Sequence, residues 1–87
     1  MHEYTISDEL RKELKKLHKK DKKRKEATIN KIKEIINNKN PNHYKNLRKP
    51  LQHLKRVHID KNFILLFKYK QETIHFITLT HHDDAYK

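Results

Sequence analysis

The chain has 87 residues, of which 33% are hydrophobic and 38% charged, so it can build one small core and should form a single domain over residues 1–87. Its 22 Lys and Arg outnumber its 11 Asp and Glu, and this net charge of +11 calls for an anionic partner such as nucleic acid or an acidic protein. The absence of cysteine excludes disulfides, and the absence of glycine excludes glycine-rich phosphate loops. The sequence also lacks an apolar run of about 18 residues, the length needed to span a bilayer.

Residues 2–6 alternate between two faces, which is typical of a short strand. One face would carry His2, Tyr4 and Ile6. The first residues contain no apolar signal region, so we expect the protein to remain in the cytoplasm, where it is made.

Two helices are predicted after this strand. Ser7 is a favourable N-cap, and the apolar residues that follow it at helical spacing are Leu10, Leu14 and Leu17. The run 18–25 contains no apolar residue, so the first helix should end near Asp21 and a second should run from about Lys23 to Asn37. One narrow apolar stripe on each helix predicts an antiparallel hairpin laid on a sheet, and one long basic helix is the alternative.

The C-terminal half is predicted to be mainly strand. Asn and Pro interrupt helical structure at 37–42, and three strand-like runs follow later, at Leu54–Ile59, Phe63–Tyr69 and Ile74–Thr80. Their connections, 60–62 and 71–73, are short enough for hairpins. The fold class is therefore α+β: a small antiparallel β-sheet with an N-terminal helical hairpin on one face, in the order β-α-α-β-β-β.

Candidate site residues lie on the sheet face that the helices leave partly open. Strand alternation puts Arg56 and His58 on one face and continues to His82 on the same face of the last strand, so these three side chains could converge. Tyr86 follows His82 by four residues and could fold back over it. Further cations, which we expect to bind RNA phosphates, are Lys45, Arg48, Lys49 and Lys55.

This set of side chains suits cleavage of an RNA phosphodiester bond without a metal. A histidine can accept the proton of a ribose 2′-hydroxyl or donate one to the leaving 5′-oxygen, and Arg or Lys can stabilise the charge on the phosphorane oxygens. An aromatic residue such as Tyr86 can stack on an unpaired base. A single surface histidine is more often only solvated, so the prediction depends on the whole set.

A metal site at 81–84 is the alternative use of these histidines, because imidazole and carboxylate are good metal ligands. Adjacent strand residues point to opposite faces, however, and the sequence holds no second ligand cluster with clear spacing. We therefore expect no metal and no other cofactor.

Four segments, at 47–51 (LRKPL), 56–59 (RVHI), 63–69 (FILLFKY) and 77–86 (ITLTHHDDAY), resemble the RelE/ParE superfamily of toxins. The similarity is closest to the RelE- and YafQ-like messenger-RNA interferases, and the predicted order of elements is also that family's order. The resemblance implies a toxin that enters the ribosomal A site and cuts mRNA there, stopping translation. It further implies a cognate RelB-like antitoxin and contact with operator DNA only through the toxin–antitoxin complex.

The resemblance also implies roles for individual residues. His82 matches the C-terminal general acid/base histidine of YafQ-like members, and Tyr86 matches the aromatic residue four positions later. His58 matches a second-strand histidine of YafQ-like members. Arg56 stands where RelE-like members carry another basic residue.

Other positions depart from the family pattern or leave a role open. Lys45 falls near a pre-strand histidine of YafQ-like toxins. Asp60 and Asn62 both stand near a turn aspartate, and the sequence register does not choose between them. Ile64 occupies a position where RelE-like members have arginine, so phosphate stabilisation is expected to fall on the remaining cations.

Two other functions stay open. A ParE-like gyrase inhibitor belongs to the same superfamily, but that branch lacks the C-terminal His/Tyr pair, so His82 and Tyr86 argue against it. A non-enzymatic nucleic-acid-binding module would use the basic face to hold phosphates and would tolerate His82→Ala. A Lys-rich surface could also serve solubility alone.

Overall fold

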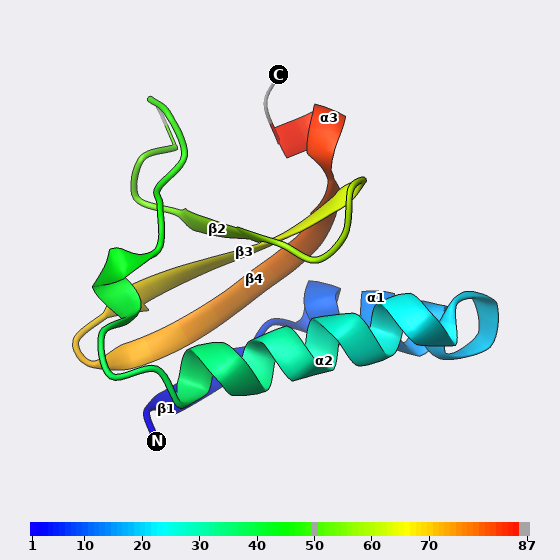
Figure 1. Ribbon diagram of the computed structural model, residues 1–87, viewed down its shortest axis with the longest axis horizontal. Coiled ribbons are helices and arrows are strands. Elements are labelled where there is room, and N and C mark those ends of the chain that lie inside the picture. Colours follow the sequence, from blue (N-terminus) through cyan, green and yellow to red (C-terminus); the bar gives the residue numbers. More distant parts are fainter. Residues whose placement is uncertain (50, 86–87) are drawn as a thin grey trace.

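A computed structural model describes residues 1–49 and 51–85. The strands are β1 (Glu3–Ile6), β2 (Lys55–His58), β3 (Phe63–Lys70) and β4 (Thr73–His81). The helices are α1 (Asp8–Lys20), α2 (Lys22–Ile36), the 3₁₀ helix η1 (Pro41–His43) and the short α3 (His82–Ala85). Figure 1 shows α1 and α2 along one side of the sheet, whereas α3 and the chain between η1 and β2 rise on the other side. The predicted order of strands and long helices is confirmed.

Capping residues define the helical hairpin. The Ser7 hydroxyl accepts a hydrogen bond from the Leu10 N–H (3.0 Å) and so begins α1. Asp21 serves both helices: its N–H donates to the Leu17 carbonyl (2.8 Å), and its carboxylate accepts from the Arg24 N–H (3.1 Å). The hairpin therefore turns on a single residue, at the position where the apolar pattern predicted the break.

The sheet has the order β1-β4-β3-β2 and is mixed. The pairs β2–β3 and β3–β4 are antiparallel, as predicted, but β1 runs parallel to β4, with Glu3 opposite Thr73 and Ile6 opposite Phe76. The expected all-antiparallel sheet is thus corrected at this one edge. The physical reason is that the helices separate β1 from the other strands, and such long connections permit parallel pairing.

The β4 strand contains a bulge. The register of β3 on β4 shifts between Leu66 and Phe67, which leaves Ile77 as an extra residue. The buried residues of β4 are spaced by two before the bulge and by three across it: Ile74, Phe76 and Leu79. The bulge keeps apolar residues on the helical side along the whole strand.

The β3–β4 hairpin closes through two residues in the left-handed region, Gln71 (φ 51°) and Glu72 (φ 64°). Such turns favour Asn-Gly, because at positive φ the Cβ atom comes too close to a backbone carbonyl oxygen. This chain has no glycine to place there. The turn therefore carries conformational strain of about 1 kcal/mol per residue.

The core lies between the helices and the sheet. It is formed by Leu10, Ile32, Ile35, Ile36, Leu65, Phe67, Ile74, Phe76 and Leu79. The opposite sheet face is also partly apolar, since Ile64 (0% exposed) and Leu66 (7%) are buried there. Their cross-strand neighbours on β2 are His58 and Arg56, so these two polar side chains lie beside apolar ones on this face.

Candidate functional site

Two histidines meet at the end of the sheet away from the β3–β4 turn. His58 is exposed at the end of β2, and His82 is the first residue of α3, directly after β4. Their ring centroids are 5.6 Å apart, with an interplanar angle of 31°. The predicted convergence of these two side chains is confirmed, although His82 begins a helix and does not continue the strand.

The backbone holds His82 in place. Its N–H donates to the Asn62 carbonyl at 2.7 Å. Its Nδ1 lies 3.8 Å from one carboxylate oxygen of Asp83, and His81 Nδ1 lies 3.7 Å from the other. Within residues 1–49 and 51–85, no group of three or more His, Asp or Glu side chains is placed to hold a metal ion.

A shallow hollow of ≈ 290 Å³ adjoins this pair. It is lined by His43, Tyr44, Lys45, Arg56, Val57 and His58. The structure thus brings together three of the predicted site residues, Lys45, Arg56 and His58. Arg56 Nη1 donates to the Asn46 carbonyl (3.3 Å), which keeps the guanidinium near the chain that carries Lys45. We call Lys45, Arg56, His58 and His82 the histidine face.

Three residues of the hollow were not predicted as site residues: Val57 and the two ring-bearing residues His43 and Tyr44. Their rings lie 4.1 Å apart, and the ring of Tyr44 also packs edge-on against Phe67 at 5.6 Å. The signal was their position immediately before Lys45 in the basic segment.

Lys55 is not where the sequence predicted it. Its side chain is only 8% exposed, and its ammonium donates to the Asn42 carbonyl (3.4 Å), the Tyr44 carbonyl (3.2 Å) and Asn46 Oδ1 (2.9 Å). Burial lowers the pKa of this lysine below its usual value. A side chain saturated by three protein oxygens cannot bind an RNA phosphate as well, so Lys55 anchors the 42–46 segment instead.

The other predicted site residues are not among those that the structure places around the hollow. Arg48 and Lys49 are exposed on the segment that leads to β2, outside the residues that line the hollow. Tyr86 lies outside the residues that the structure describes. Ile64, for which the resemblance implied an arginine in RelE-like members, is fully buried.

The turn between β2 and β3 separates the roles of Asp60 and Asn62. Asp60 Oδ1 accepts from the N–H groups of Asn62 (2.8 Å) and Phe63 (2.9 Å), and Oδ2 accepts from Arg24 Nε (2.9 Å). Partial burial alone would raise the pKa of Asp60, but these hydrogen bonds, led by that from Arg24, lower the pKa below its usual value. Asp60 is thus a structural carboxylate, and Asn62 contributes its carbonyl to His82.

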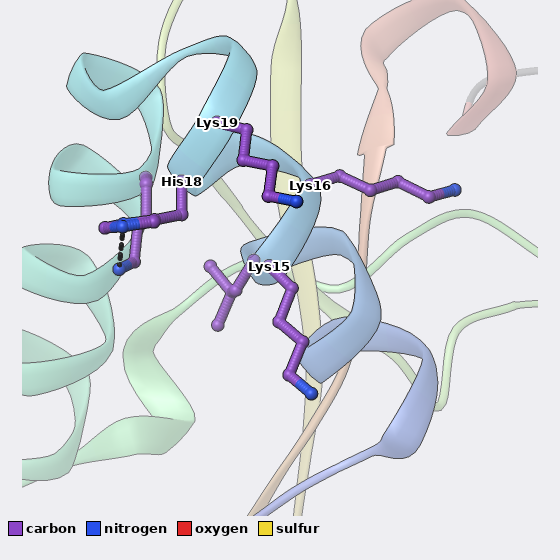
Figure 2. Close-up of a pocket in the computed structure, with 6 residues that line it drawn as sticks. Lys15, Lys16, His18 and Lys19 are labelled. Carbon is purple, nitrogen blue, oxygen red and sulfur yellow. Dashed lines mark hydrogen bonds between the residues drawn. The ribbon is translucent and has the colours of Figure 1, made fainter.

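A second basic region lies on the helical hairpin. Residues 11–25 contain ten Lys and Arg against two Asp and Glu, a net +8 of the chain's +11. There Leu14, Lys15, Lys16, His18, Lys19 and Lys25 line a depression of ≈ 520 Å³, which we call the hairpin groove. Figure 2 shows Lys15, Lys16 and Lys19 extending from α1 in different directions, while Lys25 donates a hydrogen bond to His18 Nδ1 (3.1 Å).

Within the described part of the chain, no helix is long and apolar enough to cross a membrane.

Comparison with known sequences identifies the family. No protein-family model matches the chain. The chain is 48% identical over 89 residues to a candidate toxin of Methanocaldococcus jannaschii named RelE4, and the alignment covers 100% of this chain and 93% of that protein. This chain belongs to the RelE family of toxins. A second relative is an uncharacterized protein of Methanosarcina mazei, 46% identical over 84 residues, which cover 93% of this chain and 94% of that protein.

Solved structures agree on the fold. A mutant of YafQ from E. coli superposes with a TM-score of 0.77 at 16% identity, covering 100% of both chains. A chain from the E. coli DinJ–YafQ complex superposes with a TM-score of 0.66 at 15% identity, again over 100% of both chains. The RelE/YafQ-like fold is therefore established.

Proposed function

We propose that this RelE-family protein is a ribosome-dependent, metal-independent mRNA endonuclease, the toxin of a toxin–antitoxin pair. The observation that carries the proposal is the His58–His82 pair, with ring centroids 5.6 Å apart, beside the hollow that holds Arg56 and Lys45. Two imidazoles at this spacing can flank one phosphodiester group, one acting as base and the other as acid.

The reaction follows from RNA chemistry. One imidazole takes the proton of the ribose 2′-hydroxyl, whose oxygen attacks the adjacent phosphorus. The P–O5′ bond breaks as the P–O2′ bond forms, and the leaving 5′-oxygen takes a proton from the other imidazolium. The products are a 2′,3′-cyclic phosphate and a 5′-hydroxyl. Arg56 and Lys45 stabilise the charge on the non-bridging oxygens, and Tyr86 keeps its proposed role of stacking on a base.

Dependence on the ribosome has support from the charge distribution. Residues of α1 and α2 form the hairpin groove, and Figure 1 shows these helices on one side of the sheet and α3, which begins with His82, on the other. One short RNA strand therefore does not occupy both the hairpin groove and the histidine face. A cytoplasmic toxin with these two surfaces would hold ribosomal RNA through its lysines while the mRNA strand lies at the histidines.

An acidic RelB-like antitoxin is the proposed protein partner, because the net charge of +11 favours an oppositely charged surface. The solved complex of YafQ, which has this fold, with DinJ supports a protein partner for this chain. Operator DNA would be contacted only through the toxin–antitoxin complex.

The test is primer extension on mRNA bound to programmed ribosomes. We expect cleavage at the A-site codon by the wild type, a large loss with His82→Ala, and full activity with His53→Ala, which alters an exposed histidine that does not line the hollow. Absence of cleavage by the wild type would contradict the enzyme. Equal cleavage of free RNA would contradict ribosome dependence, and binding without a His82 effect would favour the non-enzymatic module.

A further inference from the structure

We propose that Arg24 is a positioning residue of the histidine face: its ion pair with Asp60 fixes the turn on which both His58 and His82 depend. The catalytic part of this inference rests on the proposed function, whereas the geometric part does not. Arg24 belongs to α2, which Figure 1 shows on the other side of the sheet from α3, and it is not among the residues that line the hollow.

The first step of the argument is the anchorage of Arg24. Its side chain is 22% exposed and makes three contacts at once. Nε donates to Asp60 Oδ2 at 2.9 Å, Nη1 lies 3.3 Å from Asp21 Oδ2, and the guanidinium carbon lies 4.0 Å from the centroid of the Phe63 ring. The planar guanidinium suits this combination of pairing and stacking, which a lysine could not reproduce.

The second step is the turn itself. One carboxylate oxygen of Asp60 accepts a hydrogen bond from Arg24, and the other accepts from the N–H groups of Asn62 and Phe63. The turn is closed further by the Ile59 N–H, which donates to the Phe63 carbonyl at 2.9 Å. Residues 59–63 are therefore held as one unit, and Arg24 ties that unit to a long helix.

The third step links the turn to both imidazoles. His58 directly precedes this unit, so the position of β2's end follows the turn. The Asn62 carbonyl positions His82 by accepting a hydrogen bond from the His82 N–H (2.7 Å), at the point where β4 ends and α3 begins. Phe63 also stands opposite His81 in the sheet, with their rings 5.3 Å apart. A shift of the turn would move the two histidines relative to each other.

The expected consequence is a loss of rate without a loss of attachment. Misplacing reacting groups by about 1 Å can cost up to about a hundredfold in rate. An ion pair that is partly open to solvent contributes little to stability by comparison. We therefore expect Arg24→Ala to lower the single-turnover cleavage rate at saturating ribosomes by about tenfold or more, while the variant remains folded.

Two variants of opposite charge separate positioning from electrostatic attraction. Arg24→Ala lowers the net charge by one, and Asp60→Asn raises it by one while keeping an oxygen for the turn. Positioning predicts that both variants lower the saturated rate and change the shape of its pH profile. Charge attraction predicts opposite shifts in the half-saturating ribosome concentration and an unchanged saturated rate, and that outcome would overturn the inference. Lys31→Ala, which removes the Lys31–Glu34 pair (2.7 Å) from the same helix, is the matched control and should retain the wild-type rate.

Nuclear magnetic resonance decides the geometric part without any cleavage. In the wild-type protein we expect nuclear Overhauser effects between the ring protons of His58 and His82. In Arg24→Ala these should weaken or vanish while the amide signals of β3 and β4 stay dispersed. Retained ring contacts in a folded Arg24→Ala variant would refute the inference even if the wild type cleaves mRNA. Conversely, a wild type that cuts no mRNA would sink the proposed function and leave this measurement valid.

Discussion

The histidine face and the hairpin groove are both basic, but they are built in different ways. At the histidine face, hydrogen bonds fix the chain: His82 is bonded to Asn62, and Arg56 to Asn46. At the hairpin groove, lysines extend from one helix in different directions (Figure 2). Chemistry requires fixed distances between reacting groups, whereas attraction to phosphates requires only charge. The difference teaches that positive charge on this protein serves two separable tasks.

The largest expected loss of activity comes from substitutions at the histidine face. His58→Ala and His82→Ala should each lower A-site cleavage by about 10²-fold or more, because each removes one of the two proton-transfer groups. The double variant should be scarcely worse than either single one, since the two residues act as a unit. Single-turnover primer extension measures this. Fully multiplicative losses would show that the two histidines work independently.

A smaller and different effect is expected at the hairpin groove. Replacing Lys15, Lys16 and Lys19 together by Gln should weaken ribosome binding and leave the saturated cleavage rate near the wild-type value. The salt dependence of binding should become shallower by about 2 to 3 in log–log slope, because fewer counterions are released. Filter binding over a range of salt concentrations provides the measurement. An unchanged slope would remove the groove from the proposed attachment surface.

The third prediction compares a buried and an exposed lysine. Lys55→Met should lower the free energy of unfolding by about 2 kcal/mol, because the substitution leaves three oxygens of the 42–46 segment without their donor. Lys45→Met should change it by less than about 0.5 kcal/mol, since Lys45 is exposed. Urea unfolding of both variants checks the difference. Equal stabilities would mean that the ammonium of Lys55 is not needed to hold the segment.

The smallest expected effect concerns pH. Because the pKa of Asp60 is lowered in the folded state, its charge stabilises the fold above the unfolded-state pKa of about 3.9, and this contribution is lost as pH falls through the lower folded value. Asp60→Asn should therefore be less stable than the wild type at pH 7 and closer to it in acid. Thermal unfolding between acid and neutral pH measures the gap. A gap that does not narrow in acid would contradict the assigned role of the carboxylate.

Local patterns predicted much of this fold because local physics determines it. The apolar spacing of α1 and α2 and the gap in that spacing near Asp21 predicted the hairpin, and alternation predicted the convergence of His58 with His82. The parallel pairing of β1 with β4 was not predictable in this way, since it joins residues about 70 positions apart. Nothing in a local pattern carries that information.

The misplaced residues have a similar explanation. Lys45 and Lys55 belong to the same basic stretch, and charge alone does not reveal that one is exposed and the other buried under the 42–46 segment. His82 continues an alternating pattern, yet the chain bends into α3 at that residue. The position of Arg24 beside Asp60 depends on how the hairpin lies against the sheet, which is a property of the whole fold.

The central place of β4 has a consequence for the order in which the protein can assemble during synthesis. β4 lies inside the sheet and pairs with both β1 and β3, although it leaves the ribosome after the other three strands. Before Thr73–His81 emerges, β1 has no neighbour in the sheet. A nascent chain therefore presents its basic helices first, and the sheet closes together with the histidine pair only once β4 is free to pair.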